Sequence, residues 1–257
     1  MRAHGVAVRD IRIEEVRSEP GLTDNVNAAI ELSEDLGLDP SQLWLRMRRR
    51  SEQAGARWIT GVITDLRSSP VVRTADSEEQ LDTDVVVLAA GAWSPAVARS
   101  LGIDLPIRAA KGYSVTLPDI DPVPTRPMLL MDQRTAINPL RSGLRISARY
   151  EITTPDDREI VGHRLPAMIT RARQAIELPE HTPVVEPWTG VRPASVDGAP
   201  YIGFLPTKGS TQVLVASGHG MIGTAMAAGT ADLVTRLAFG EHVTDAEAHL
   251  GPQRLFA

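Results

Sequence analysis

The residues best suited to chemistry lie near the end of the chain, where Gly218-His219-Gly220-Met221-Ile222-Gly223 matches the pattern G-x-G-x-x-G. The pattern follows an apolar run and opens a helix-forming segment, as a dinucleotide-binding turn requires. Too few residues follow for a second parallel strand, so this is not a complete βαβ unit. The glycines allow close backbone approach, and the helix N-terminus favours an anion or an electron-rich carbonyl. The alternative for this segment is a tight strand-to-helix corner that binds no ligand. The alternative for His219 is a residue that packs at the start of the helix and takes no part in catalysis.

A second candidate is Arg192, in the dense segment Trp188–Gly203. The residue before a proline is held in an extended conformation, and Arg192 precedes Pro193. An arginine fixed in this way presents a planar fork of donors that suits a carboxylate. The alternative is an ordinary surface arginine.

Composition excludes several classes of protein. The chain has 257 residues, 42% of them hydrophobic and 23% charged, with a net charge of −5 and no cysteine. Disulfide scaffolds, zinc–cysteine sites, iron–sulfur clusters and thiol nucleophiles are therefore excluded. No His-x-x-His spacing predicts a metal site, and the mild acidity does not favour nucleic acid. No apolar run is long enough to span a bilayer and no secretory signal is present, which predicts a cytoplasmic location.

The first half of the chain predicts elements that would position these residues. Asp39 as N-cap and Pro40 at the first position predict a helix that runs to Ala54 and ends at Gly55. Strands are predicted at 57–60, 61–66, 71–74 and 84–89. The last is continuously apolar, which is typical of a strand buried on both faces in a parallel sheet. It leads into a small-residue turn, with Ser94 as N-cap and Pro95 as first residue of the next helix.

The rest of the chain predicts two further blocks. Strands at 112–117, 128–131, 135–139 and 144–150, followed by a helix at about 157–178, predict an antiparallel sheet with a helix. A strand at 212–216 and a helix at about 225–239 repeat the strand–turn–helix order predicted after residue 84.

In order along the chain, these pieces resemble the flavin-dependent D-amino acid oxidase superfamily, and most of all bacterial D-amino acid dehydrogenases and glycine oxidases. The stretches that carry the resemblance are Glu15–Pro20, Leu38–Pro40, Val85–Ser94 (VVVLAAGAWS), Pro106–Leu117 (with KGYSVTLP), Trp188–Gly203 (WTGVRPASVDGAPYIG) and Ser217–Gly223 (SGHGMIG).

The resemblance implies a mixed α/β fold, with a partial FAD/NAD(P)-binding Rossmann-like domain and an antiparallel-sheet substrate domain. Residues 1–105 would form the partial FAD-binding domain, with a short contribution to the substrate domain near 25–38. Residues 106–185 would form the substrate domain, and 186–257 would return to the FAD-binding domain.

The resemblance also implies an FAD-dependent oxidoreductase acting on CH–NH₂ groups. It would transfer the α-hydrogen of an amino acid to flavin as hydride, and the imino acid would hydrolyse to a 2-oxo acid and ammonia. Arg192 would anchor the substrate carboxylate, and Glu151 would either meet the substrate amine or remain an exposed carboxylate at a strand end. The residues implied at the FAD are Ala90, Gly91, Trp93, Gly218, His219, Gly220, Met221, Ile222, Gly223 and Thr224.

The chain departs from the family pattern in two places. The N-terminal βαβ unit that binds the ADP half of FAD is expected to be missing, so the chain would be a truncated form or would depend on another polypeptide for that unit. Where dehydrogenases tend to read Gly-Thr-x-Glu, this chain reads Ala148-Arg149-Tyr150-Glu151, so the substrate preference stays open. The alternatives are a sarcosine- or glycine-oxidase-like enzyme, and a non-catalytic remnant that binds a carboxylate or a partner chain without FAD. Peripheral membrane contact would be expected if a quinone accepts the electrons.

Overall fold

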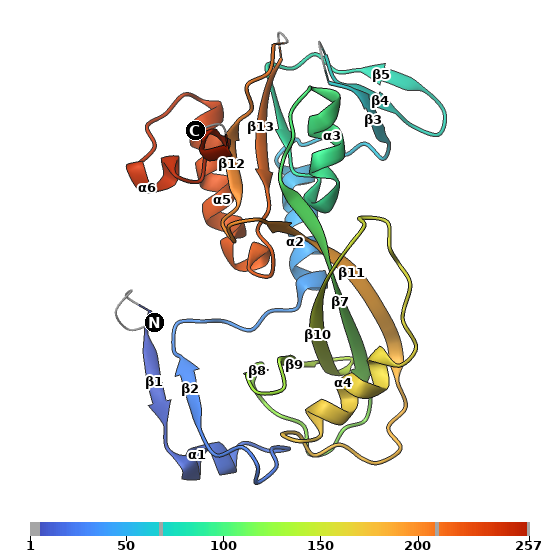
Figure 1. Ribbon diagram of the computed structural model, residues 1–257, viewed down its shortest axis with the longest axis vertical. Helices are drawn as coiled ribbons and strands as arrows, with labels where there is room; N and C mark the ends of the chain where they lie inside the picture. Colours follow the sequence, from blue (N-terminus) through green and yellow to red (C-terminus); the bar gives the residue numbers. More distant parts are fainter. Residues whose placement is uncertain (1–5, 67–68, 209–210, 256–257) are drawn as a thin grey trace. The chain divides into compact units, whose positions relative to one another are not determined.

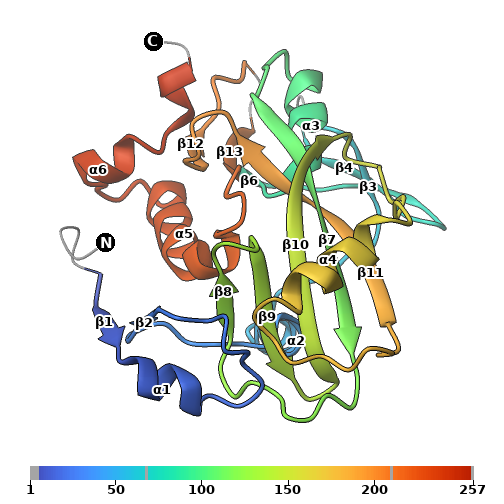
Figure 2. The ribbon, with the colours of Figure 1, turned by 60° about the horizontal axis from the view of Figure 1, so that its bottom comes forward.

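The computed structural model describes residues 6–66, 69–208 and 211–255. The chain has a mixed α/β fold, as predicted, and divides into two compact units, whose elements are labelled in Figures 1 and 2. The first unit comprises the described residues up to Leu45, Lys111–Glu151 and Arg158–Gly190. The second comprises Arg46–Ala110, Ile152–Asp157 and the described residues from Val191 onward.

A five-stranded antiparallel sheet is the centre of the first unit. Its strand order is β11 (Val185–Ser195), β7 (Ile107–Leu117), β10 (Gly143–Thr153), β9 (Thr135–Leu140) and β8 (Met128–Leu130). Buried Leu144 and Ile146 alternate with the half-exposed Arg145, because successive side chains of a strand point to opposite faces. Helix α4 (Arg164–Ala172) adds Met168, Ile169 and Ala172 to the apolar core of this sheet (Figure 2).

The N-terminal segment packs with this sheet. It forms β1 (Val8–Ile11), α1 (Ile13–Ser18) and β2 (Ala29–Leu32), elements that the sequence analysis did not predict. Thr23 donates its backbone N–H to the carbonyl oxygen of Ala175 at 3.0 Å. All described residues up to Leu45 thus belong to this unit, whereas only 25–38 were expected in the substrate domain. Which unit serves substrate and which serves cofactor stays a prediction.

The predicted helix at 157–178 is wrong at both ends, since α4 spans only Arg164–Ala172. Val161 and Gly162 precede it, and both residue types weaken a helix. At the other end, Ile176 forms a β-bridge with Leu22, which holds that part of the chain extended.

A three-stranded sheet is the centre of the second unit, in the order β12 (Tyr201–Phe204), β13 (Gln212–Ser217) and β6 (Val85–Leu88). β13 pairs with β6 in parallel, as predicted for the apolar strand, and with β12 antiparallel. Helices α3 (Ser94–Ser100) and α5 (Gly223–Ala238) follow β6 and β13. The buried core of this sheet consists of Leu88, Ala98, Ile103, Leu105, Ile107, Tyr201, Leu205, Val213 and Val215.

Helix α2 (Pro40–Gln53) begins as the sequence predicts. One carboxylate oxygen of Asp39 accepts the backbone N–H of Ser41 at 2.9 Å, and Gly55 follows the helix with a φ of +93°. A small antiparallel sheet follows, made of β3 (Val62–Asp65), β4 (Val71–Arg73) and β5 (Glu78–Gln80). The short elements η2 (Gly91–Trp93), α6 (Asp245–Ala248) and η3 (Pro252–Leu255) complete the second unit.

Three further expectations about local structure are corrected. The predicted strand at 57–60 is absent, because no described strand offers it a partner. β6 is not buried on both faces: it pairs only with β13 among the described strands, and Val87 is 44% exposed. Ser94 is the first residue of α3 rather than its N-cap, because the turn η2 leads directly into the helix.

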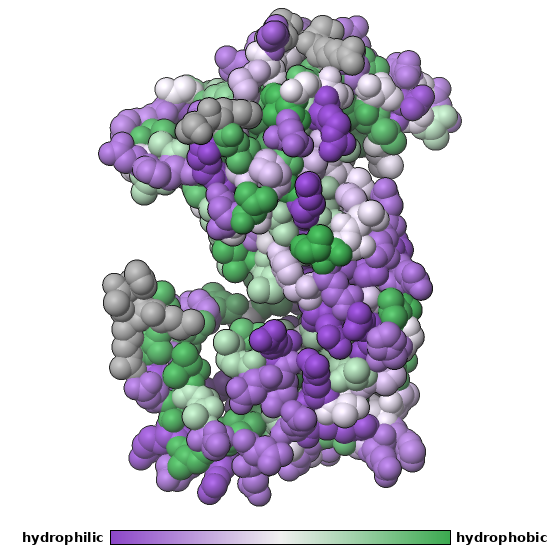
Figure 3. All heavy atoms as spheres, in the orientation of Figure 1, coloured by the Kyte–Doolittle hydropathy of each residue, from purple (hydrophilic) through white to green (hydrophobic). Residues whose placement is uncertain are grey.

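Apolar side chains also reach the surface elsewhere. No described side chain of α2 is buried, and Trp44 and Met47 are exposed on it. Figure 3 shows hydrophobic residues on the visible surface of both units, among hydrophilic ones. None of the helices in the described ranges is long and apolar enough to cross a bilayer.

Candidate functional site

The glycine-rich turn joins β13 to α5 and has the predicted backbone form. Gly218 and Gly220 have φ angles of +95° and +57°, which residues with a Cβ rarely adopt. Helix α5 begins at Gly223, and its N-cap residue, Ile222, makes no side-chain hydrogen bond to the first turn. The first backbone N–H groups of an α-helix have no partner within the helix. They are therefore suited to a ligand that carries acceptor atoms.

This turn is fastened to β11 beside Arg192. Gly220 donates its backbone N–H to the carbonyl oxygen of Pro193 at 2.8 Å, and His219 forms a β-bridge with Ala194. Arg192 directly precedes these two residues in the strand and is half-buried. The structure thus brings Arg192 next to the turn, although 26 positions separate Arg192 from Gly218 in the sequence.

A second turn, Ala90–Trp93, lies at the same sheet edge. β6 and β13 run parallel with Leu88 opposite Val215, so both strands end at the same edge. The Ser217 hydroxyl donates to the carbonyl oxygen of Gly91 at 3.0 Å and joins the two turns. Gly91 has a φ of +56°, and a Cβ added there would meet nothing within 4 Å, so a ligand has room to approach its backbone.

Asp156, which the sequence analysis missed, holds Trp93. The indole Nε1–H of Trp93 donates to a carboxylate oxygen of Asp156 at 2.9 Å. Asp156 lies in the loop after β10 and belongs to the second unit, whereas most of residues 106–185 belong to the first. No local pattern marks a single aspartate 63 positions away from its partner.

His219 contacts helix α5 as well as β11. Its Nε2 lies 3.0 Å from the hydroxyl oxygen of Thr230, and the ring is half-buried. Burial disfavours the charged imidazolium and lowers the pKa of His219 below its ordinary value. Thr230 is a second residue that the sequence analysis missed.

Glu151 lies in the first unit and has a cationic partner. A guanidinium nitrogen of Arg164 lies 3.1 Å from one carboxylate oxygen of Glu151. The Tyr113 hydroxyl lies 3.5 Å from the other oxygen, at the limit of a hydrogen bond. The Arg164 charge would compete with a substrate amine for this carboxylate, so the role of Glu151 stays a prediction.

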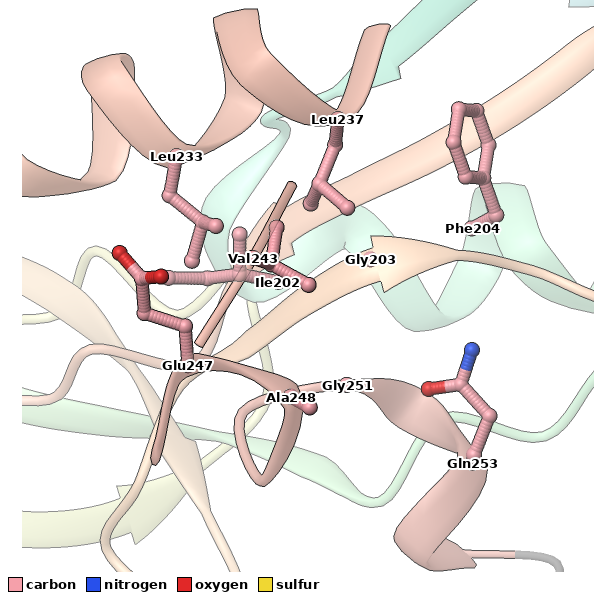
Figure 4. Close-up of a pocket in the computed structure, with 10 residues that line it drawn as sticks. All are labelled: Ile202, Gly203, Phe204, Leu233, Leu237, Val243, Glu247, Ala248, Gly251 and Gln253. Atoms are coloured by element: carbon pink, nitrogen blue, oxygen red, sulfur yellow. The ribbon is translucent and has the colours of Figure 1, made fainter. Parts of the chain in front are cut away.

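A small pocket of about 320 Å³ in the second unit has a different lining (Figure 4). Residues of β12 and α5 form half of its lining, and Glu247 contributes a carboxylate that is already paired with Arg236. The pocket shares no residue with the two turns. In the described ranges, no group of three or more His, Asp or Glu residues is placed to hold a metal ion.

The two turns and Arg192 fit one part of a flavin nucleotide. They offer backbone at left-handed glycines, an uncapped helix N-terminus and the exposed apolar side chains of Met221 and Ile222. A planar, electron-rich ring system needs such a combination of apolar contact and backbone donors.

Comparison with known proteins identifies the family. The family model described as "FAD dependent oxidoreductase" matches residues 1–237. An uncharacterised oxidoreductase of Halorhodospira halophila is 32% identical over 209 residues, which cover 79% of this chain and 87% of that protein. A D-amino acid dehydrogenase of Cereibacter sphaeroides is 28% identical over 254 residues, which cover 93% of this chain and 56% of the relative.

The fold agrees with these matches. The crystal structure of glycine oxidase from Geobacillus kaustophilus superposes with a TM-score of 0.83 at 23% identity, covering 97% of this chain and 68% of that one. An identity this low establishes the shared fold and not the substrate. The chain spans little more than half of the D-amino acid dehydrogenase that it matches. The match to the family model covers most of the sequence, and the chain belongs to the FAD-dependent oxidoreductase family.

Proposed function

We propose that this chain forms the flavin-ring and substrate part of an FAD-dependent amino-acid oxidoreductase. The observation that carries the proposal is the meeting of the two turns and Arg192 at one sheet edge, through the Gly220–Pro193 and Ser217–Gly91 hydrogen bonds. When bound, FAD would accept a hydride from the α-carbon of an amino acid, whose imino product hydrolyses to a 2-oxo acid and ammonia.

The residues of this chain would bind and orient rather than act as a strong base. Arg192 would hold the substrate carboxylate, and the first turn of α5 would face the ring edge where negative charge accumulates. Trp93, fixed by Asp156, would border the same site. Orientation of the reacting C–H bond supplies much of the rate in such a reaction.

We further propose that a segment supplying an ADP-binding unit completes the cofactor site. Three features of this chain support it: β6 has one unpaired edge among the described strands, Val87 is exposed on it, and half of the residues of α5 are exposed. An unpaired apolar strand is a template for a further strand. The segment would be part of a longer form of this protein or a separate chain.

A kinetic comparison tests the role of Arg192. The chain is assayed alone and co-expressed with the part of the Cereibacter sphaeroides D-amino acid dehydrogenase that lies outside the matched region. D-amino acids, glycine and sarcosine are the substrates. Loss of a charge-assisted carboxylate contact costs about 2–4 kcal/mol, so Arg192→Ala should raise KM about 30-fold to 1,000-fold.

Arg99→Ala is the matched control, because Arg99 is exposed on α3 and lies outside the two turns and β11. It should leave KM unchanged. Equal KM values for Arg192→Ala and the unmodified chain would refute the anchor. The substrate that turns over fastest distinguishes a D-amino acid dehydrogenase from a glycine- or sarcosine-oxidising enzyme.

A further inference from the structure

The contact between His219 and Thr230 links the glycine-rich turn to the interior of helix α5. His219 lies in the middle of the glycine-rich turn, and Thr230 lies about two helical turns inside α5. The 3.0 Å contact between the imidazole Nε2 and the Thr230 hydroxyl therefore ties the turn back onto the helix that it opens.

A glycine next to the His219 side chain leaves room for this contact. A Cβ added at Gly223 would lie 3.2 Å from the Cβ of His219, so a side chain at Gly223 would press on the histidine. On its other side His219 forms a β-bridge with Ala194 of β11. His219 is thus held to a strand through its backbone and to a helix through its imidazole.

We propose that His219 is a positioning residue, which fastens the Gly218–Gly223 turn to α5 through Thr230 and so holds the first N–H groups of α5 in place for the cofactor. Its effect on FAD rests on the function proposed above. The contact between the His219 imidazole and the Thr230 hydroxyl does not depend on FAD and is testable without it.

The environment of His219 makes the fastening sensitive to pH. Within this unit, the charged residue on β11 is Arg192, and those on α5 are Asp232 and Arg236, which pair with each other at 2.9 Å. The cause of the lowered pKa is burial. The unfolded or opened turn would bind a proton at about pH 6.5, the ordinary value for histidine.

The sign of the pH effect follows from this difference. Above about pH 6.5 the imidazole is neutral in both states, and the fastening contributes fully. As pH falls from there toward the lower pKa of the folded state, the opened turn takes up the proton first, and the fastening weakens. The affinity of the unmodified protein for FAD should therefore decrease as pH falls below about 6.5.

The first experiment uses the cofactor-free chain. The imidazole of His219 is followed by NMR from pH 4 to pH 8, and its signal is assigned by its absence in His219→Gln. We expect a pKa below that of exposed histidines in the unmodified chain. Thr230→Val should move it toward the ordinary value, because a turn released from α5 exposes the imidazole to water. Thr230→Ser, which keeps the hydroxyl and the contact, should not. An equal pKa in all three proteins would overturn the proposal.

The second experiment measures FAD dissociation constants at pH 5.5 and pH 7.5, with the ADP-binding segment supplied. Thr230→Val should weaken FAD binding about five-fold at pH 7.5, the equivalent of about 1 kcal/mol for one neutral hydrogen bond. Thr235→Val is the matched control, because Thr235 lies on the same helix and bonds to its own helix backbone, the carbonyl oxygen of Ala231. His219→Gln should remove the acid-side loss of affinity.

The two experiments separate the two proposals. If no FAD is retained by any form while the NMR results are as expected, the proposed function fails and the fastening stands. If FAD is retained with the same affinity in Thr230→Val and the unmodified chain, His219 does not position the cofactor-binding turn.

Discussion

Replacing Gly218 with alanine tests whether the turn needs its left-handed backbone. Gly218 has a φ of +95°, and a Cβ there would lie 3.4 Å from both Ser195 and Tyr201, in ordinary contact. Crowding is therefore not the main cost. The left-handed conformation costs a residue with a Cβ about 1–2 kcal/mol, and reduced freedom of the unfolded chain returns about 0.4–1 kcal/mol. The net loss of stability should be about 1 kcal/mol.

Gly229→Ala is the matched control. Gly229 lies inside α5, is exposed, and a Cβ there would meet nothing within 4 Å. Alanine in a helix interior is about 0.5–1 kcal/mol more favourable than glycine. The same substitution should therefore stabilise the chain here, although both glycines lie within one turn-and-helix segment.

Thermal unfolding followed by circular dichroism measures both effects. One kcal/mol shifts the midpoint by about 2–4 °C for a domain of this size, so the two variants should move in opposite directions. Gly218→Ala should also weaken FAD binding, because the turn would relax away from its present path. Equal midpoints for the two variants, or a rise for Gly218→Ala, would refute the reasoning.

Three further substitutions have clear expectations. Gly143→Ala should cost about 2–4 kcal/mol in urea unfolding, since Gly143 has a φ of +126° and the added Cβ would overlap the Leu117 carbonyl oxygen; a loss below 1 kcal/mol would contradict this. Arg149→Gly should raise stability by about 0.5–1 kcal/mol, because Arg149 has a φ of +77° inside β10; a lower midpoint would mean that its side chain contributes more than its backbone strain costs. Glu247→Gln should flatten the acid limb of the stability curve. The Arg236 guanidinium lowers the pKa of Glu247 to about 2, so the contribution of this carboxylate is present above its unfolded pKa of 4.5 and is lost as pH falls toward 2. If the acid limb of Glu247→Gln is the same as that of the unmodified chain, the Glu247 carboxylate makes no such contribution to stability.

Local signals predict most elements of this chain. The apolar run Val85–Leu88 and the strand before Gly218 form a parallel pair, as continuous apolar runs predict, although Val87 remains exposed. Asp39 begins α2 as its type and position predict, and the glycine-rich pattern marks the start of α5. These features depend on a few neighbouring residues, which a sequence displays directly.

Features that depend on distant partners were not predictable in the same way. The sequence at 57–60 has the aromatic and β-branched residues that strands favour, but a strand exists only where another strand accepts its hydrogen bonds. The early end of α4 depends on Leu22, more than 150 positions before Ile176. Asp156 and Thr230 act on the candidate site through single hydrogen bonds to Trp93 and His219, and no spacing rule marks them.

The most direct test of the central claim is cofactor retention. FAD is added to the purified chain, alone and with the part of the Cereibacter relative that lies outside the matched region, and each sample is desalted before an absorbance spectrum is taken. We expect a flavin band near ~450 nm to survive desalting when the segment is present, and to weaken in Gly218→Ala but not in Gly229→Ala. A sample that keeps no flavin in either form would contradict the assignment of the two turns and Arg192 to a flavin site.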